Sequence, residues 1–125
     1  QAGVSKFGLF NDAGYKGLYG NFLAEIEKRK RLKKGELLDR AGSTELAANL
    51  FRITQTDEKI RNESIKGDYK ASNTHFVVGQ KVRQTIRDIG GTMPENLKAE
   101  KHIKELERER KKLLKANQTK KQLTK

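Results

Sequence analysis

The feature that most constrains the fold is a pair of long stretches, 43–66 and 72–89, in which apolar residues recur at helical spacing. Glycine follows both stretches, as it does at many helix ends. We therefore predict two amphipathic helices at the centre of a mainly α-helical domain, with Ser43 as the N-cap of the first. The first stripe, interpreted as core, comprises Leu46, Leu50, Ile53, Ile60 and Ser64. The second comprises His75, Val78, Val82, Ile86 and Ile89.

Shorter helices are predicted on either side of this pair. Residues 21–32 have helical spacing and end in a basic turn, residues 35–42 favour a short helical turn, and residues 92–95 ("TMPE") match a capping box. In the last predicted helix, 99–117, the apolar stripe is too narrow for a buried helix. It consists of Ile103, Leu106, Arg110 and Leu113. This helix is predicted either to lie on the surface or to pair with a second chain, so a homodimer through it is one hypothesis.

The N-terminal stretch 6–21, "KFGLFNDAGYKGLYGN", lacks helical periodicity and contains four glycines. Because glycine weakens helices and strands alike, we predict a short irregular or β-like segment with turns at Asn11-Asp12 and Gly14. Two interpretations of its aromatic residues remain open. In one, Phe7, Phe10 and Tyr19 anchor the segment against the helices. In the other, Tyr15 and Tyr19 stay partly exposed beside cations, as a platform for unpaired bases or for a partner's loop.

Composition limits the size of the core. Hydrophobic residues make up 34% and charged residues 35% of the 125-residue chain, so a lean core is expected. We predict one small domain of four to five helices, with a helical core at 1–97 and a basic C-terminal helix with a frayed tail at 98–125. The sequence has no cysteine, and no apolar run approaches the roughly eighteen residues that a membrane helix needs.

No arrangement of residues in the sequence indicates catalysis. His75 falls on an apolar stripe, which favours a core histidine, and His102 lies in a charged helix, which favours a solvated one. The carboxylates of residues 57–63 alternate with cations at helical spacing, which indicates surface ion pairs. Neither a nucleophile elbow nor a phosphate-binding loop is present. We therefore expect a protein that is not an enzyme and that uses no metal or cofactor.

The net charge of +12 is unevenly distributed along the chain. It is +4 over residues 1–40, +1 over 41–97 and +7 over 98–125. This balance favours a polyanionic partner, with a solvated surface as the alternative. The segment 28–34, "KRKRLKK", has more cations than a helix end needs to complement its dipole, and phosphate binding explains the excess. The predicted nucleic-acid-binding residues are Lys28, Arg29, Lys30, Arg31, Lys33, Lys34, Tyr15, Tyr19, Arg108, Arg110, Lys111 and Lys112.

Three segments together carry a resemblance to a known family. They are "GYKGLYG", "STELAANLFRITQTDEKIRNE" and "NTHFVVGQKVRQTIRDIGGTMPE". Over residues 4–115 the chain resembles the C-terminal half of the bacterial DNA-damage-inducible protein D family. The resemblance implies a BRO-like N-terminal domain in full-length members, which is absent from this chain, so a fragment is expected. One departure from the family's pattern is that "KAEKHI" follows "PENL" without a proline-containing connection.

The resemblance implies a pathway but no site. It leads us to expect a non-catalytic accessory of the bacterial DNA-damage (SOS) response, acting in the cytoplasm at the nucleoid, in DNA repair or in the regulation of recombination. The first hypothesis is sequence-independent binding of DNA, or of a recombinase-DNA filament, through the basic surface. The second is a protein-interaction or dimerisation module whose DNA contacts are made by the missing N-terminal domain.

Overall fold

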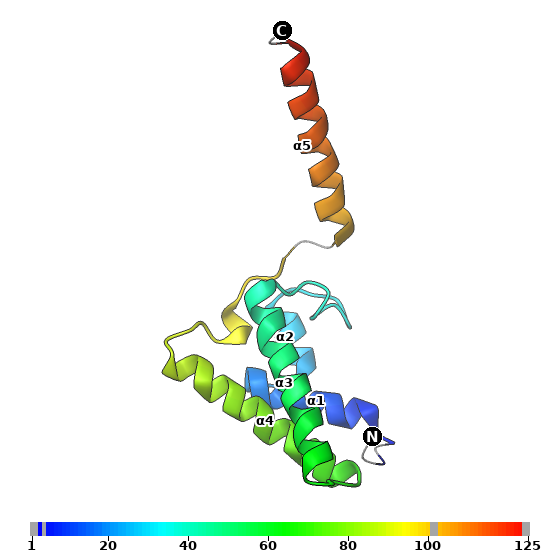
Figure 1. Ribbon diagram of the computed structural model, residues 1–125, viewed down its shortest axis with the longest axis vertical. Coiled ribbons are helices and arrows are strands. Elements are labelled where there is room, and N and C mark those ends of the chain that lie inside the picture. Colours follow the sequence, from blue (N-terminus) through cyan, green and yellow to red (C-terminus); the bar gives the residue numbers. More distant parts are fainter. Residues whose placement is uncertain (1–2, 4, 101–102, 124–125) are drawn as a thin grey trace.

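The computed structural model describes residue 3, residues 5–100 and residues 103–123, with the side chains of 107–117 in the last helix. These residues form helices and turns, with no strand among them, so the prediction of a mainly α-helical domain is confirmed (Figure 1). The elements in chain order are α1 (Phe7–Tyr19), α2 (Leu23–Arg29), α3 (Ser43–Asn62), α4 (Asp68–Asp88), a 3-10 turn η1 (Pro94–Asn96) and α5 (Ile103–Leu123).

The N-terminal stretch is the helix α1, so the prediction of an irregular or β-like segment was wrong. Each glycine inside α1 weakens it by about 1 kcal/mol relative to alanine, and a helix of this length is marginal alone. α1 is supported by α4, which runs parallel to it (Figure 1). Where both helices begin, Asp68 accepts hydrogen bonds from the backbone N–H groups of Ser5 and Lys6, at 2.7 and 3.1 Å. Where α1 ends, Arg83 donates to the Leu18 carbonyl at 3.2 Å.

Glycines let the backbones of α1 and α4 approach each other directly. A Cβ atom on Gly17 would lie 2.3 Å from the Phe76 carbonyl oxygen. A Cβ on Gly79 of α4 would lie 2.8 Å from both the Gly14 carbonyl oxygen and the Leu18 backbone nitrogen. Real Cβ atoms do not approach backbone so closely, so side chains at Gly17 and Gly79 would force the two helices apart. Gly17 was one of the N-terminal glycines from which we predicted that no helix forms there. Together with Gly79 it is what allows this helix pair to form.

Helix α3 turns polar residues toward the interior and apolar residues toward solvent. Its buried side chains are Glu45, Asn49, Arg52, Thr56 and Ile60. The predicted core stripe was therefore wrong at Leu46, Leu50 and Ile53, all of which are exposed, and Leu50 is 53% exposed. Only Ile60 of that stripe is buried. The structure places the polar face inward because its groups bond to one another and to neighbours on α1, α4 and the turn after α2.

The apolar core is small, as the composition predicts. Its main cluster contains Leu18, Tyr19, Ile26, Leu37 and Val82. A second cluster, at the far end of α3 and α4, contains Ile60 and Ala71. Val82 is buried as predicted, whereas Ile89, at the end of the predicted stripe on α4, is exposed. A core of this size leaves much of the packing to the helix contact through glycine and to buried polar groups.

Several helix ends differ from the prediction. The N-cap of α3 is Gly42 rather than Ser43, and no side chain caps it. Residues 35–42 form turns, and the Arg40 N–H donates to the Glu36 carbonyl at 2.9 Å, as in the short helical turn predicted there. The predicted capping box gives only the 3-10 turn at Pro94. The last helix begins at Ile103 and continues to Leu123, where a frayed tail was predicted. It stands away from the other helices (Figure 1).

The contact between α1 and α4 predicts the effect of adding one methyl group. Gly17→Ala should destabilise the fold by about 1–3 kcal/mol, because the new Cβ has only backbone to meet. Gly8→Ala in the same helix is the matched control, since a Cβ there has no neighbour within 4 Å. It should leave the free energy of unfolding unchanged or raise it by up to about 1 kcal/mol. Equilibrium denaturation checks both variants, and equal effects of the two would contradict the close contact.

Candidate nucleic-acid interface

The segment 28–34 forms the end of α2 and the turn that follows it. Helix α2 ends at Arg29, and Arg31 adopts a left-handed conformation with φ of 59°, which turns the chain away from the helix axis. Five of the six cations in this segment have exposed side chains. They are Lys28, Arg29, Arg31, Lys33 and Lys34. The turn spreads these groups over a broad surface, so we call them the basic turn.

Lys30 does not belong to this surface, and its prediction as a nucleic-acid-binding residue was wrong. Its side chain is only 3% exposed and forms an ion pair with Glu45 of α3 at 2.7 Å. The same Nζ donates to the Leu97 carbonyl, also at 2.7 Å. These contacts fasten the end of α2 to α3 and to the segment before α5. Lys30 therefore has a structural role that its neighbours in the sequence do not share.

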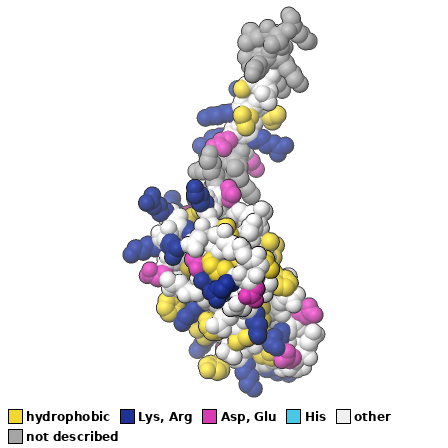
Figure 2. Space-filling model, turned by 90° about the vertical axis from the view of Figure 1, so that its left-hand side faces the viewer, with side chains coloured by type: hydrophobic (Ala, Val, Ile, Leu, Met, Phe, Trp, Pro, Cys, Tyr) yellow, Lys and Arg dark blue, Asp and Glu magenta, His cyan; other side chains and the backbone are white. Residues whose placement is uncertain are grey.

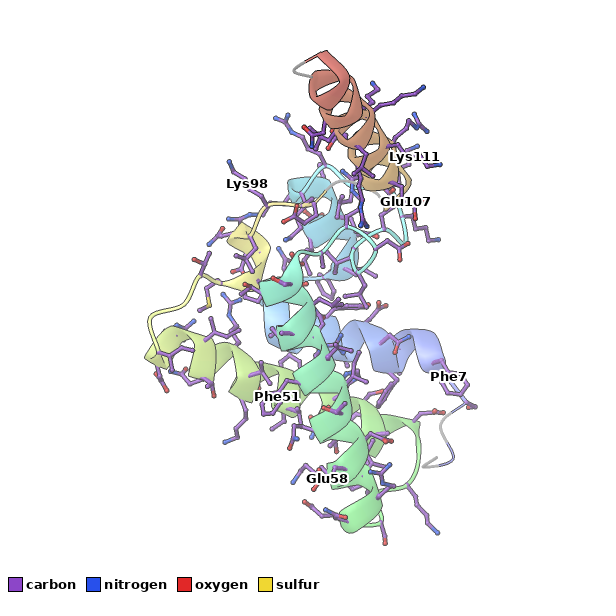
Figure 3. The ribbon with its side chains drawn as sticks, turned by 45° about the horizontal axis from the view of Figure 1, so that its top comes forward. Phe7, Phe51, Glu58, Lys98, Glu107 and Lys111 are labelled. Atoms are coloured by element: carbon purple, nitrogen blue, oxygen red, sulfur yellow. The ribbon has the colours of Figure 1, made fainter. Side chains whose placement is uncertain are left out.

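The two basic segments predicted from the sequence lie at the same end of the molecule (Figure 1). The backbone N–H of Glu100 donates to the Arg40 carbonyl at 2.6 Å, and Arg40 Nε donates back to the Glu100 carbonyl. These bonds hold the start of the connection to α5 against the loop that follows the basic turn. Figure 3 shows Lys98 and Lys111 at this end. The predicted cations of α5, all exposed, are Arg108, Arg110, Lys111 and Lys112.

A second basic surface lies between α1 and α4 and was missed by the sequence analysis. A groove of about 330 Å³ is lined by Lys16 of α1 and by Gln80, Gln84 and Arg87 of α4. Arg83, at its edge, is held by Glu95 through two hydrogen bonds of 2.8 Å. The available signal was the polar stripe at positions 80, 84 and 87, which helical spacing places on one face. Figure 2 shows Lys and Arg side chains over the body and along the described part of α5.

The predicted aromatic platform is not available for stacking. Tyr19 is 1% exposed, and its hydroxyl bonds to Glu45 and accepts from Asn49 Nδ2, the latter at 2.9 Å. Tyr15 is half-buried, with the Arg52 guanidinium 4.7 Å above its ring. Burial and the hydrogen bond to Glu45 raise the pKa of Tyr19 above its usual range. The burial of Tyr19 confirms the interpretation in which it anchors the segment and contradicts the one in which it stays partly exposed, and the ring of Tyr15 is already covered by a cation.

His75 lies in the interior, as predicted, within a buried polar network. The Arg52 guanidinium donates to His75 Nε2, and Arg52 Nη2 donates to Asn49 Oδ1 at 2.8 Å. Because a guanidinium can only donate, Nε2 accepts and the imidazole proton lies on Nδ1, which donates to the Phe10 carbonyl at 2.8 Å. Burial and the adjacent Arg52 charge lower the pKa of His75 from 6.5 to about 4. The other histidine, His102, lies outside the described residues.

The carboxylates of α3 form the surface ion pairs that their spacing predicts. Arg61 pairs with Asp57 at 2.7 Å, and Lys59 pairs with Glu63 at 2.5 Å. Within the described part of the chain, no group of three His, Asp or Glu side chains is close enough to hold a metal ion. The described helices also include none that is long and apolar enough to cross a membrane.

The neutral state of buried His75 predicts a pH dependence of stability. Between pH 6.5 and about 4 the unfolded chain binds a proton at His75 and the folded chain does not, so stability falls as the pH falls. The expected loss over this range is up to about 3 kcal/mol, or about 1.4 kcal/mol per pH unit. Denaturant titrations of the wild type and of His75→Gln, which lacks the titrating group, isolate the effect. Equal pH slopes in the two proteins would contradict it.

Comparison with known proteins agrees with the resemblance noted from the sequence. No solved structure matches the chain. A relative in Escherichia coli strain K12, DNA damage-inducible protein D, is 52% identical over 113 residues, which cover 86% of this chain and 41% of the relative. The chain thus spans less than half the length of that relative. The pattern of the DinD C-terminal domain family matches residues 1–106, and the chain belongs to this family.

Proposed function

We propose that this domain is a non-catalytic accessory of the DNA-damage response that binds DNA, or a recombinase-DNA filament, through the basic turn and the exposed cations of α5. The relative's name, DNA damage-inducible protein D, supports the pathway. The proposal places the domain on chromosomal DNA in the bacterial cytoplasm. The observation that supports the binding mode is the position of two basic segments, far apart in sequence, at one end of the molecule.

The chemistry of these side chains suits phosphate contacts that ignore base sequence. Lys28, Arg31 and Lys33 are exposed, and their spread around a turn suits neighbouring phosphates along a backbone better than a single compact anion. The exposed part of α5 carries further cations on a helix that stands away from the body (Figure 1). Of the two tyrosines considered for stacking on bases, Tyr19 is buried and the ring of Tyr15 is covered by Arg52, so the proposal rests on electrostatic contacts alone.

The test replaces Lys28, Arg31 and Lys33 together with Gln. Binding of a random-sequence duplex is measured by fluorescence anisotropy across a salt series. The slope of log affinity against log salt should fall by up to about 3, since each lost phosphate contact removes about 0.9. The matched control replaces Lys59, Lys66 and Lys70, exposed cations near the turn between α3 and α4, and changes the net charge by the same amount.

The control distinguishes binding through the basic turn from a general effect of the protein's net charge. If the basic turn binds the phosphate backbone of DNA, the control variant keeps most of the wild-type slope of log affinity against log salt. An equal reduction in both triple variants would show that only net charge matters. An unchanged slope in the variant of the basic turn would contradict the proposal.

A second candidate function, a protein-interaction or dimerisation module, is favoured by the exposed apolar face of α3. We call Leu46, Leu50 and Ile53 the α3 ridge. Beside it, a groove of about 300 Å³ between α3 and α4 is lined mainly by apolar residues, among them Phe51, labelled in Figure 3, and Ile86. A contiguous apolar surface of this kind marks interaction sites. The C-terminal helix supplies another candidate surface, since Leu113 and Leu114 are exposed.

Light scattering over a concentration series tests self-association through these surfaces. If the α3 ridge joins two copies, Leu50→Ser combined with Ile53→Ser should give a monomer. Its free energy of unfolding should change little, by about 0.5 kcal/mol per exposed site. A chain truncated after Leu97 would become monomeric instead if the C-terminal helix joined the copies. A wild-type chain that is monomeric at every concentration would contradict both routes.

A further inference from the structure

Arg52 is a buried cation without a carboxylate partner. It is 2% exposed, and no Asp or Glu side chain of the described residues forms an ion pair with it. Its partners are neutral: Asn49, His75 and the ring of Tyr15. Its Nε has no hydrogen-bond partner at all. A buried charge is costly unless it is paired, so this arrangement is unusual for a residue that serves stability alone.

Arg52 also lines a cavity that opens to the surface. The cavity, of about 400 Å³, lies between α1 and α3 and has His75 in its wall. Its apolar walls are supplied by Phe10, Leu38 and Ile53. Its rim carries exposed Asn11, Thr54 and Asp57. One buried guanidinium at an otherwise mainly apolar cavity fits a ligand with one negative charge and an apolar stem.

The position of the cavity indicates where such a ligand comes from. Ile53 lines the cavity and also belongs to the α3 ridge. A protein chain that covers the ridge would therefore pass over the mouth of the cavity. A Glu or Asp side chain of that protein has the required carboxylate on a short aliphatic stem.

We propose that the Arg52 cavity receives a carboxylate side chain from a partner protein that covers the α3 ridge. The Arg52 guanidinium donates to the carboxylate, and the walls from Phe10 and Leu38 contact the aliphatic stem. A phosphate fits less well, because it carries more charge than the one guanidinium at the cavity balances. The site goes beyond the DNA-binding proposal, since none of its residues belongs to the basic turn.

The test uses blocked amino acids as probes in ¹H–¹⁵N NMR titrations of the whole chain. N-acetyl-glutamate amide carries the carboxylate, and N-acetyl-glutamine amide is its uncharged counterpart of the same shape. The carboxylate probe should shift the resonances of cavity residues, including the Arg52 Nε–H, and should bind at least about tenfold more tightly than the amide, the range for a hydrogen bond to a charged group.

Two variants make the assignment specific to the cavity. Thr54→Trp fills the mouth from an exposed position and should abolish binding of the carboxylate probe. Thr85→Trp is the matched control: Thr85 is exposed on α4, lies outside the cavity and, like Thr54, donates its hydroxyl to the carbonyl four residues earlier. This control should bind the probe like the wild type. Thr54→Trp should also leave the salt slope of DNA binding unchanged, so failure here and failure of the DNA proposal are distinguishable.

Five outcomes would overturn the proposal. Equal affinity for the two probes, or no shift with either, would show that Arg52 does not select a carboxylate. Retained binding in Thr54→Trp would place the probe elsewhere. Inorganic phosphate binding at these residues more tightly than the carboxylate probe would assign the cavity to a phosphate ligand. Hexanoate binding more tightly than the blocked glutamate would assign it to a free aliphatic acid instead of a protein side chain.

Discussion

The direct backbone contact between α1 and α4 is the constraint on which the rest of the structure depends. It exists because Gly17 of α1 and Gly79 of α4 carry no side chains where the helices meet. Once the pair is formed, α3 packs against α4, and its Asn49 and Arg52 contact Tyr19 and Tyr15 of α1. The interior then has room for Tyr19, His75 and Arg52. Arg52 bonds to His75 and Asn49, and the Tyr19 hydroxyl bonds to Asn49 and Glu45. A chain with a lean apolar composition thereby gains a defined interior from close helix packing and buried hydrogen bonds.

This interior explains why α3 buries its polar face and exposes its apolar face. Its polar side is required inside to complete the network through Glu45, Asn49 and Arg52. Its apolar side, the α3 ridge, is consequently left to solvent beside an apolar groove and the Arg52 cavity. Since the inward face finds most of its hydrogen-bond partners inside the domain, the outward face is left open to contact another molecule. One face of α3 therefore stabilises the domain, and the opposite face is the candidate surface for protein interaction.

The sequence predicts the long helices and their glycine ends well, because periodicity and chain breakers are local signals. It predicts the burial of His75 from its place on a stripe. The prediction from sequence fails at α1, because the low helix propensity of glycine is overridden by the contact between Gly17 and α4, about sixty residues further along the chain. It fails again on α3, since the hydrophobic stripe rule assumes that polar groups seek water, whereas Asn49 and Arg52 find partners inside. The separation of Lys30 from its basic neighbours also depended on Glu45, a residue distant in sequence.

The functional account depends on the end of the molecule that carries the basic turn and the exposed cations of α5. Chemical-shift mapping with a short random-sequence DNA duplex tests it most directly, because every backbone amide reports separately. The account predicts that the largest shifts fall at residues 28–34 and 98–115, with little change at the turn between α3 and α4. Shifts confined to the α3 ridge, or spread evenly over the surface, would contradict it.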